Sequence, residues 1–190
     1  MRILLIMIPR SGSVSLLNAL SESLNFNKIG EPFNSYLWKT LPNIETDNTV
    51  IKTFIDQTPD GTNPIEFYTS FVKEFDKVIL VSRKNIIEAV ESYSYHIQNS
   101  TKEGWVKPYY YDDNTNIDKY YDWFLSMETQ IIELSKNLDI EIDWYEDIFS
   151  GDVNTLTKFL KKHQLNVNLD IFMKFINPKN RYRQFKPIII

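Results

Sequence analysis

The chain has 190 residues, a formal net charge of -4, 43% hydrophobic and 14% aromatic residues, and no cysteine. This composition fits one folded domain spanning residues 1–190 and argues against disorder, a disulfide framework and a cysteine-bound metal. No apolar stretch reaches the roughly 20 residues of a membrane span, and the negative net charge makes nucleic acid a poor partner, so we expect a cytoplasmic protein with no metal site.

The first residues predict a strand, a turn and a helix. The apolar run Ile3–Ile8 is typical of a strand buried on both faces, and the turn Pro9–Ser13 follows it. Apolar residues then repeat at helical spacing as Leu16, Leu17, Leu20 and Leu24. Strand-like and helix-like segments alternate in the same way along the rest of the chain. This alternation predicts an α/β fold with a parallel sheet between two layers of helices.

Further elements are expected in chain order. Strands are predicted at 28–33, 49–55, 78–81 and 140–145, and helices at 35–41, 64–75, 86–97, 118–138 and 154–163. Residues 99–117 show no period and carry four aromatic residues, which favours an ordered lid that contacts an acceptor. Residues 177–190 form a basic tail.

The turn Pro9–Ser13 predicts an anion site. The first amides of a helix have no partner within the helix, and the helix dipole is positive at that end. Arg10 adds a fixed positive charge. The alternative is an ordinary turn that binds nothing, with Ser11 or Ser13 as the N-cap. A standard P-loop lysine–serine pair is absent, which disfavours ordinary ATP or GTP chemistry.

A second basic group is expected at the same edge of the sheet, because ligands of parallel sheets bind beyond the carboxyl ends of the strands. Arg83 follows the strand at 78–81 and can hold a phosphate as a bidentate fork. Ser92, on the next helix, is placed to join it. The alternative is a solvated arginine and a surface serine.

Three segments together resemble sulfotransferases that use 3′-phosphoadenosine 5′-phosphosulfate (PAPS). Ile8–Ser13 is similar to the family's 5′-phosphosulfate loop, Leu80–Tyr93 to its 3′-phosphate motif, and Trp144–Ile148 to its Tyr-Glu-Asp-Leu segment. The resemblance covers residues 1–163 in order. It implies a P-loop-like sulfotransferase fold and transfer of a sulfuryl group from PAPS to a hydroxyl of a carbohydrate or other small acceptor, leaving 3′-phosphoadenosine 5′-phosphate (PAP).

The resemblance also implies roles for individual residues. Arg10 would contact the phosphosulfate, the following turn would wrap the 5′-phosphate, and Arg83 with Ser92 would hold the 3′-phosphate. Lys52 would add charge, the alternative being a lysine at a strand edge that extends to water. The tail would close over the nucleotide, the alternative being a solvated basic tail. The implied binding set is Arg10, Ser11, Gly12, Ser13, Val14, Lys52, Arg83, Ser92, Arg181 and Arg183. The serine of the family pattern usually lies one position earlier, where this chain has Glu91.

A base is needed to take the proton from the acceptor hydroxyl. Many family members carry a histidine after the Lys-Thr pair, where this chain has Phe54. Glu31, at the end of a predicted strand, is similar to the glutamate that several carbohydrate-directed members use, and His96 is the alternative. Two other functions stay open, a catalytically degenerate nucleotide-binding module and a P-loop-like nucleotide kinase.

Overall fold

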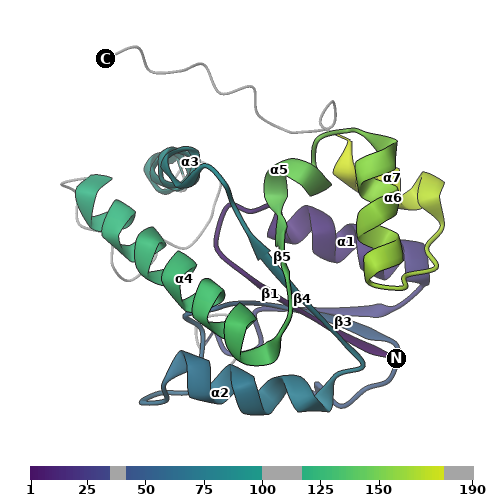
Figure 1. Ribbon diagram of the computed structural model, residues 1–190, viewed down its shortest axis with the longest axis horizontal. Helices are drawn as coiled ribbons and strands as arrows, with labels where there is room; N and C mark the ends of the chain where they lie inside the picture. The colour runs from purple at the N-terminus through teal and green to yellow at the C-terminus, as the bar shows by residue number, and fades with distance from the viewer. Residues whose placement is uncertain (35–41, 100–116, 178–190) are drawn as a thin grey trace.

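The computed structural model describes residues 1–34, 42–99 and 117–177, with side chains except those of 95–99 and 117–119. Five parallel strands form one sheet in the order β2-β3-β1-β4-β5, and helices cover both faces (Figure 1). The predicted α/β class is therefore confirmed. None of the helices in the described ranges is both long and apolar enough to cross a membrane.

The elements alternate along the chain as the sequence predicts. The strands are β1 (Arg2–Met7), β2 (Asn27–Gly30), β3 (Thr49–Phe54), β4 (Lys77–Ser82) and β5 (Ile142–Trp144). The helices are α1 (Ser13–Leu24), α2 (Pro64–Phe71), the 3₁₀ turn η1 (Val72–Glu74), α3 (Ile86–Asn99), α4 (Ile117–Leu138), α5 (Tyr145–Ile148), α6 (Val153–Lys162) and α7 (Leu169–Ile176).

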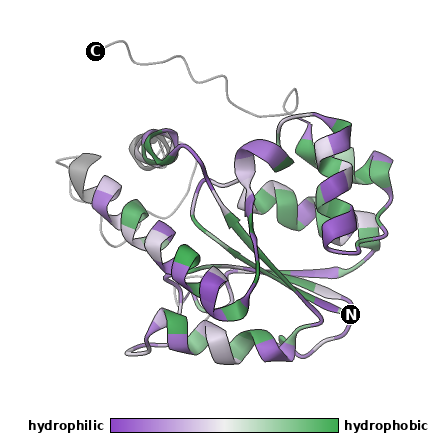
Figure 2. Ribbon diagram, viewed as in Figure 1, coloured by the Kyte–Doolittle hydropathy of each residue, from purple (hydrophilic) through white to green (hydrophobic). Residues whose placement is uncertain are grey.

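The central strand β1 contributes to two hydrophobic cores, one on each face of the sheet. Ile3, Leu5 and Met7 face the core under α1, α6 and α7. Leu4 and Ile6 face the core under α2, α3 and α4. Because successive side chains of a strand point to opposite faces, burial on both faces requires an uninterrupted apolar run. The green strands at the centre of Figure 2 show this run.

The connections diverge around the carboxyl end of β1. β1 leads into α1 on one face, whereas its neighbours β3 and β4 lead into α2 and α3 on the other face. In open α/β sheets, ligands bind at such a switch point. The fold thus places the turn after β1 where a ligand is expected.

The structure corrects several expected boundaries. The helix expected at 64–75 ends at Phe71 and continues as η1, and the strand expected at 140–145 is only Ile142–Trp144, because Tyr145 already begins α5. Helix α7 was not predicted; the side chain of Asn168 caps it by accepting from the amide of Ile171, and it packs on α1. The helix expected at 35–41, nearly all of the expected lid at 99–117 and nearly all of the tail at 177–190 lie outside the described residues.

Candidate functional site

The turn between β1 and α1 is held in a conformation that few residues adopt. Arg10 has φ 61° and Gly12 has φ 73°, both left-handed. A Cβ on Gly12 would lie 2.4 Å from the ring of Phe149, so both the backbone and the packing require glycine there. The hydroxyl of Ser11 donates to the carbonyl of Ile8 at 2.5 Å, so it fixes the turn from inside.

Helix α1 begins without a side-chain cap. Its N-cap is Gly12, and the first helical hydrogen bond runs from the amide of Leu16 to the carbonyl of Gly12 at 2.9 Å. The amides of residues 13–15 therefore have no carbonyl partner in the helix. The alternative in which Ser11 or Ser13 serves as an ordinary N-cap is wrong, since neither side chain caps α1. Val14, in the first turn, is 61% exposed.

Arg83 and Ser92 both meet this turn, at its residue Arg10. Nη1 of Arg83 donates to the carbonyl of Arg10 at 3.1 Å, and Nε of Arg10 donates to Oγ of Ser92 at 2.9 Å. Ser92 is buried, whereas Glu91 is exposed, so the serine is the residue that faces the turn. Arg83 is only 8% exposed, which makes the alternative of a solvated arginine and a surface serine wrong.

Two carboxylates surround the guanidinium of Arg83. Nη2 donates to Glu88 at 2.8 Å, and Nε lies 3.6 Å from Oε1 of Glu146. Glu146 also accepts from the backbone amides of Lys84 at 2.9 Å and Asn85 at 3.2 Å, just before α3. A carboxylate of the protein thus already lies at a helix start beside an arginine, a position that suits an anion.

A buried ion pair joins the ends of β2 and β3. Nζ of Lys52 lies 2.5 Å from Oε1 of Glu31, and Lys52 is 2% exposed. Oε2 of Glu31 accepts from Nδ2 of Asn34 and from Nε2 of Gln57, both at 2.9 Å. Lys52 also lies over the ring of Phe54, 4.3 Å from its centroid. Lys52 is therefore paired with Glu31, and its expected role of adding charge at the anion stays a prediction.

The pair changes the acidity of both of its members. Burial disfavours the charged form of Glu31, but the charge of Lys52 and the surrounding hydrogen bonds outweigh it, so the pKa of Glu31 is lowered. Burial also lowers the pKa of Lys52, and the charge of Glu31 opposes this only in part. A carboxylate with a lowered pKa is fully ionised at neutral pH and is a weaker base than a free glutamate.

A second carboxylate, Asp56, follows β3 and was not anticipated from the sequence. Its Oδ2 accepts from the indole Nε1 of Trp123 on α4 at 3.1 Å. The buried hydroxyl of Tyr68 fixes this segment by donating to the carbonyls of Phe54 at 2.9 Å and Gln57 at 2.6 Å. The only sequence signal for Asp56 is its place just beyond a buried strand.

These groups define the rim site, which comprises the turn 10–13, Val14 at the start of α1, Arg83, Ser92, Glu31, Lys52 and Asp56. Three predicted site residues cannot be placed in it. Arg181 and Arg183 lie outside the described residues, and His96 lies in α3 with its side chain outside the described part.

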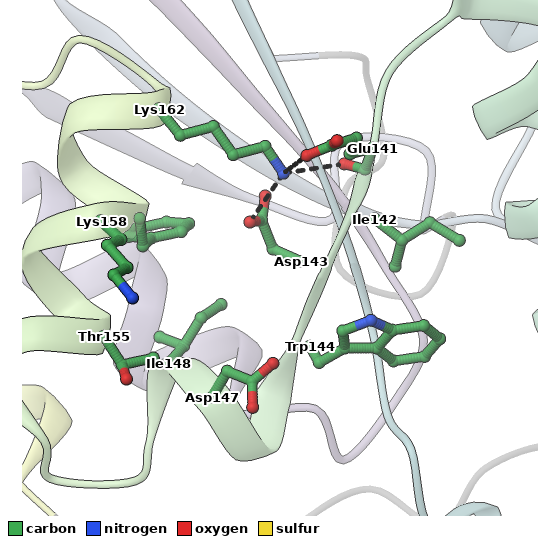
Figure 3. Close-up of a pocket in the computed structure, with 10 residues that line it drawn as sticks. Glu141, Ile142, Asp143, Trp144, Asp147, Ile148, Thr155, Lys158 and Lys162 are labelled. Carbon is green, nitrogen blue, oxygen red and sulfur yellow. Dashed lines mark hydrogen bonds and ion pairs between the residues drawn. The ribbon is translucent and has the colours of Figure 1, made fainter.

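A separate cavity of about 420 Å³ lies beside β5, between α5 and α6 (Figure 3). Lys162 reaches across it to Asp143 at 3.0 Å and to Glu141 at 3.3 Å. None of the predicted site residues whose side chains the structure describes lines this cavity, which we call the β5 hollow.

Neither a protein-family model nor a curated protein sequence matches this chain. Because a fold alone does not determine function, the function has to be inferred from the chemistry of the rim site.

Proposed function

We propose that this protein is a PAPS-dependent sulfotransferase with a P-loop-like α/β fold, acting on a hydroxyl of a carbohydrate or other small molecule. The observation that carries the proposal is the uncapped start of α1, with Arg10 in its turn and Arg83 bound to the same turn. Open helix amides beside two arginines are an arrangement suited to a multiply charged phosphate ligand.

The residues of the rim site fit such a donor. Gly12 gives the turn its left-handed backbone, and no side chain caps the start of α1, so the amides of Ser13 and Val14 would bind the 5′-phosphosulfate. Nε of Arg83 is buried and makes no hydrogen bond within the described part of the chain, so this arginine retains a donor for the 3′-phosphate. The bound donor would supply the sulfuryl group, and Arg10 would stabilise the negative charge that develops on the leaving phosphate.

Glu31 is the base in this proposal. It is ionised, and Lys52, Asn34 and Gln57 hold its orientation, so it can accept a hydrogen bond from an acceptor hydroxyl and take the proton. Lys52 keeps the carboxylate charged and in place. His96 remains the alternative base.

The first test is calorimetric titration with PAP, with ADP as the ligand that lacks the 3′-phosphate. We expect micromolar binding of PAP, weaker binding of ADP, and a loss of about 10- to 100-fold in PAP affinity for Arg83→Ala, since a hydrogen bond to a charged group contributes about 1.5–3 kcal/mol. Lys162→Met, in the β5 hollow, is the matched control and should bind PAP as the wild type does. Equal binding of PAP and ADP, or no binding, would contradict the proposal.

One observation favours the second candidate, a nucleotide-binding module without catalysis. Glu88 and Glu146 already neutralise Arg83, and an incoming 3′-phosphate would have to displace at least one of them. Binding of PAP with no sulfuryl transfer to any of a broad panel of hydroxyl acceptors would support this candidate. Transfer that is lost in Arg10→Ala and in Glu31→Gln would support the enzyme.

A further inference from the structure

The carboxylate of Asp56 borders a group of three aromatic rings that the proposed chemistry does not use. Trp123, which donates its indole proton to Asp56, packs edge-on against Tyr93 with ring centroids 5.2 Å apart. Tyr93 packs in the same way on Tyr120 at 5.3 Å. None of the three aromatic residues is fully buried, and Asp56 is exposed. An exposed acidic residue thus lies beside rings from α3 and α4.

This group is continuous with the rim site. Tyr93 directly follows Ser92, which binds Arg10. Burial raises the pKa of the Tyr93 phenol to about 12, with smaller effects from Tyr120, Asp56, Arg10 and Glu31. The phenol is therefore neutral at pH 7 and within electrostatic reach of Arg10 and both carboxylates. Asp56 and its rings thus lie near Glu31 and Arg10 of the same site.

The two carboxylates of the site differ in how their charge is balanced. Lys52 neutralises Glu31, whereas Asp56 has a neutral indole as its side-chain donor and forms no ion pair within the described residues. Burial of the Asp56 carboxyl group raises its pKa, and the charge of Glu31 adds a smaller effect in the same direction. The residue as a whole is exposed. A cation placed beside Asp56 would remove this imbalance.

Building on the proposed sulfotransferase function, we propose that Asp56 and the rings of Trp123 and Tyr93 form an acceptor subsite that selects hydroxylated amines, such as sugars with a free amino group. The ammonium group pairs with Asp56 and with the aromatic faces, and the apolar face of the sugar packs on the same rings. An acidic sugar meets like charge at Asp56, which provides selection against it.

The selection is tested by direct binding, which does not depend on turnover. A trimer of glucosamine, the matched trimer of N-acetylglucosamine and a trimer containing glucuronic acid are titrated by calorimetry, with and without PAP, at a pH at which the amine is protonated. We expect the amine trimer to bind at least about tenfold more tightly than the acetylated one, equivalent to about 1.4 kcal/mol. The acidic trimer should bind most weakly.

Two variants assign the preference to Asp56. Asp56→Asn keeps the shape and an acceptor for the indole but removes the charge, so the preference should fall to about twofold or less, where charge no longer contributes. Glu133→Gln, an exposed position on α4, makes the same change in net charge and should leave the preference intact. Equal binding of the three trimers, binding of none, or a preference that survives Asp56→Asn would overturn the subsite.

Failure of the subsite and failure of the proposed function give different results. If the sulfotransferase proposal is wrong and the subsite is right, the amine preference and its loss in Asp56→Asn remain while PAP does not bind. If the subsite alone is wrong, PAP binds and neutral or acidic acceptors are sulfated as well as the amine.

Discussion

The rim site and the β5 hollow both gather charged side chains, but they balance charge differently. In the hollow, Nζ of Lys162 pairs with Asp143 at 3.0 Å. Beside the hollow, Nε2 of His163 lies 2.6 Å from the same carboxylate, and these residues come from β5 and the adjacent end of α6. In the rim site the charged groups come from the ends of β1, β2, β3 and β4. Nε of Arg83 makes no hydrogen bond in the described residues, although Glu146 lies 3.6 Å away, and no side chain caps the first amides of α1. A ligand engages donors that lack a hydrogen-bond partner, and Nε of Arg83 and the first amides of α1 are such donors in the rim site.

The largest expected difference between the two regions concerns their lysines. Lys52→Met leaves the Glu31 carboxylate mostly buried and unpaired, so we expect a loss of about 3 kcal/mol in the free energy of unfolding. Lys162→Met, at a lysine whose side chain is 32% exposed, should cost about 1 kcal/mol or less. Urea denaturation of both variants measures the difference.

A double variant separates the unpaired charge from lost packing. Lys52→Met with Glu31→Gln removes both charges and should recover part of the stability lost in Lys52→Met. If Lys52→Met and Lys162→Met lower the free energy of unfolding equally, the Glu31–Lys52 pair is no more important for stability than the Asp143–Lys162 pair.

The difference between the regions also explains what sequence could predict. The turn 10–13 was recognised because its chemistry is local, resting on a strand end, a glycine and a helix start within a few residues. The pairing of Glu31 with Lys52 was not predicted, because the two residues are 21 positions apart in the sequence. They meet through the register of β2 and β3, which places Gly30 opposite Lys52. The contact of Asp56 with Trp123 spans 67 residues and depends on how α4 packs on the sheet.

The predicted bounds of helices and strands are wrong where tertiary contacts override the local sequence pattern. Tyr145 has strand propensity, yet it begins α5 because its ring lies against Phe149, with centroids 4.8 Å apart, and under the guanidinium of Arg83. Helix α7 carried a readable signal, a capping Asn168 before apolar residues at helical spacing, and it was missed. The α/β class, by contrast, follows from apolar runs that are buried on both faces, which only a covered parallel sheet accommodates.

A smaller effect is expected from the left-handed backbone of Arg10. This conformation costs a residue with a Cβ roughly 1 kcal/mol relative to glycine. Arg10→Gly should therefore be about 1 kcal/mol more stable than Arg10→Ala, while both variants lose the bond to Ser92 and the affinity for PAP. The same pair of substitutions at Arg2, within β1, is the control and should show the opposite order, because glycine weakens a strand. Equal stability of the two Arg10 variants would show that no strain is stored at the turn.

The smallest effect is the pH dependence of the Glu31 contribution. The pKa of Glu31 in the folded protein lies below its ordinary value of 4.5, so its stabilising contribution is present above that value and is lost as the pH falls through the folded pKa. The difference in unfolding free energy between the wild type and Glu31→Gln should therefore shrink on acidification. In the Lys52→Met background, burial becomes the dominant influence on the Glu31 carboxyl and raises its pKa. The pH dependence should then reverse, so that the protein with Glu31 becomes more stable relative to its Glu31→Gln variant as the pH falls. An unchanged sign in that background would mean that Asn34 and Gln57, rather than Lys52, keep Glu31 charged.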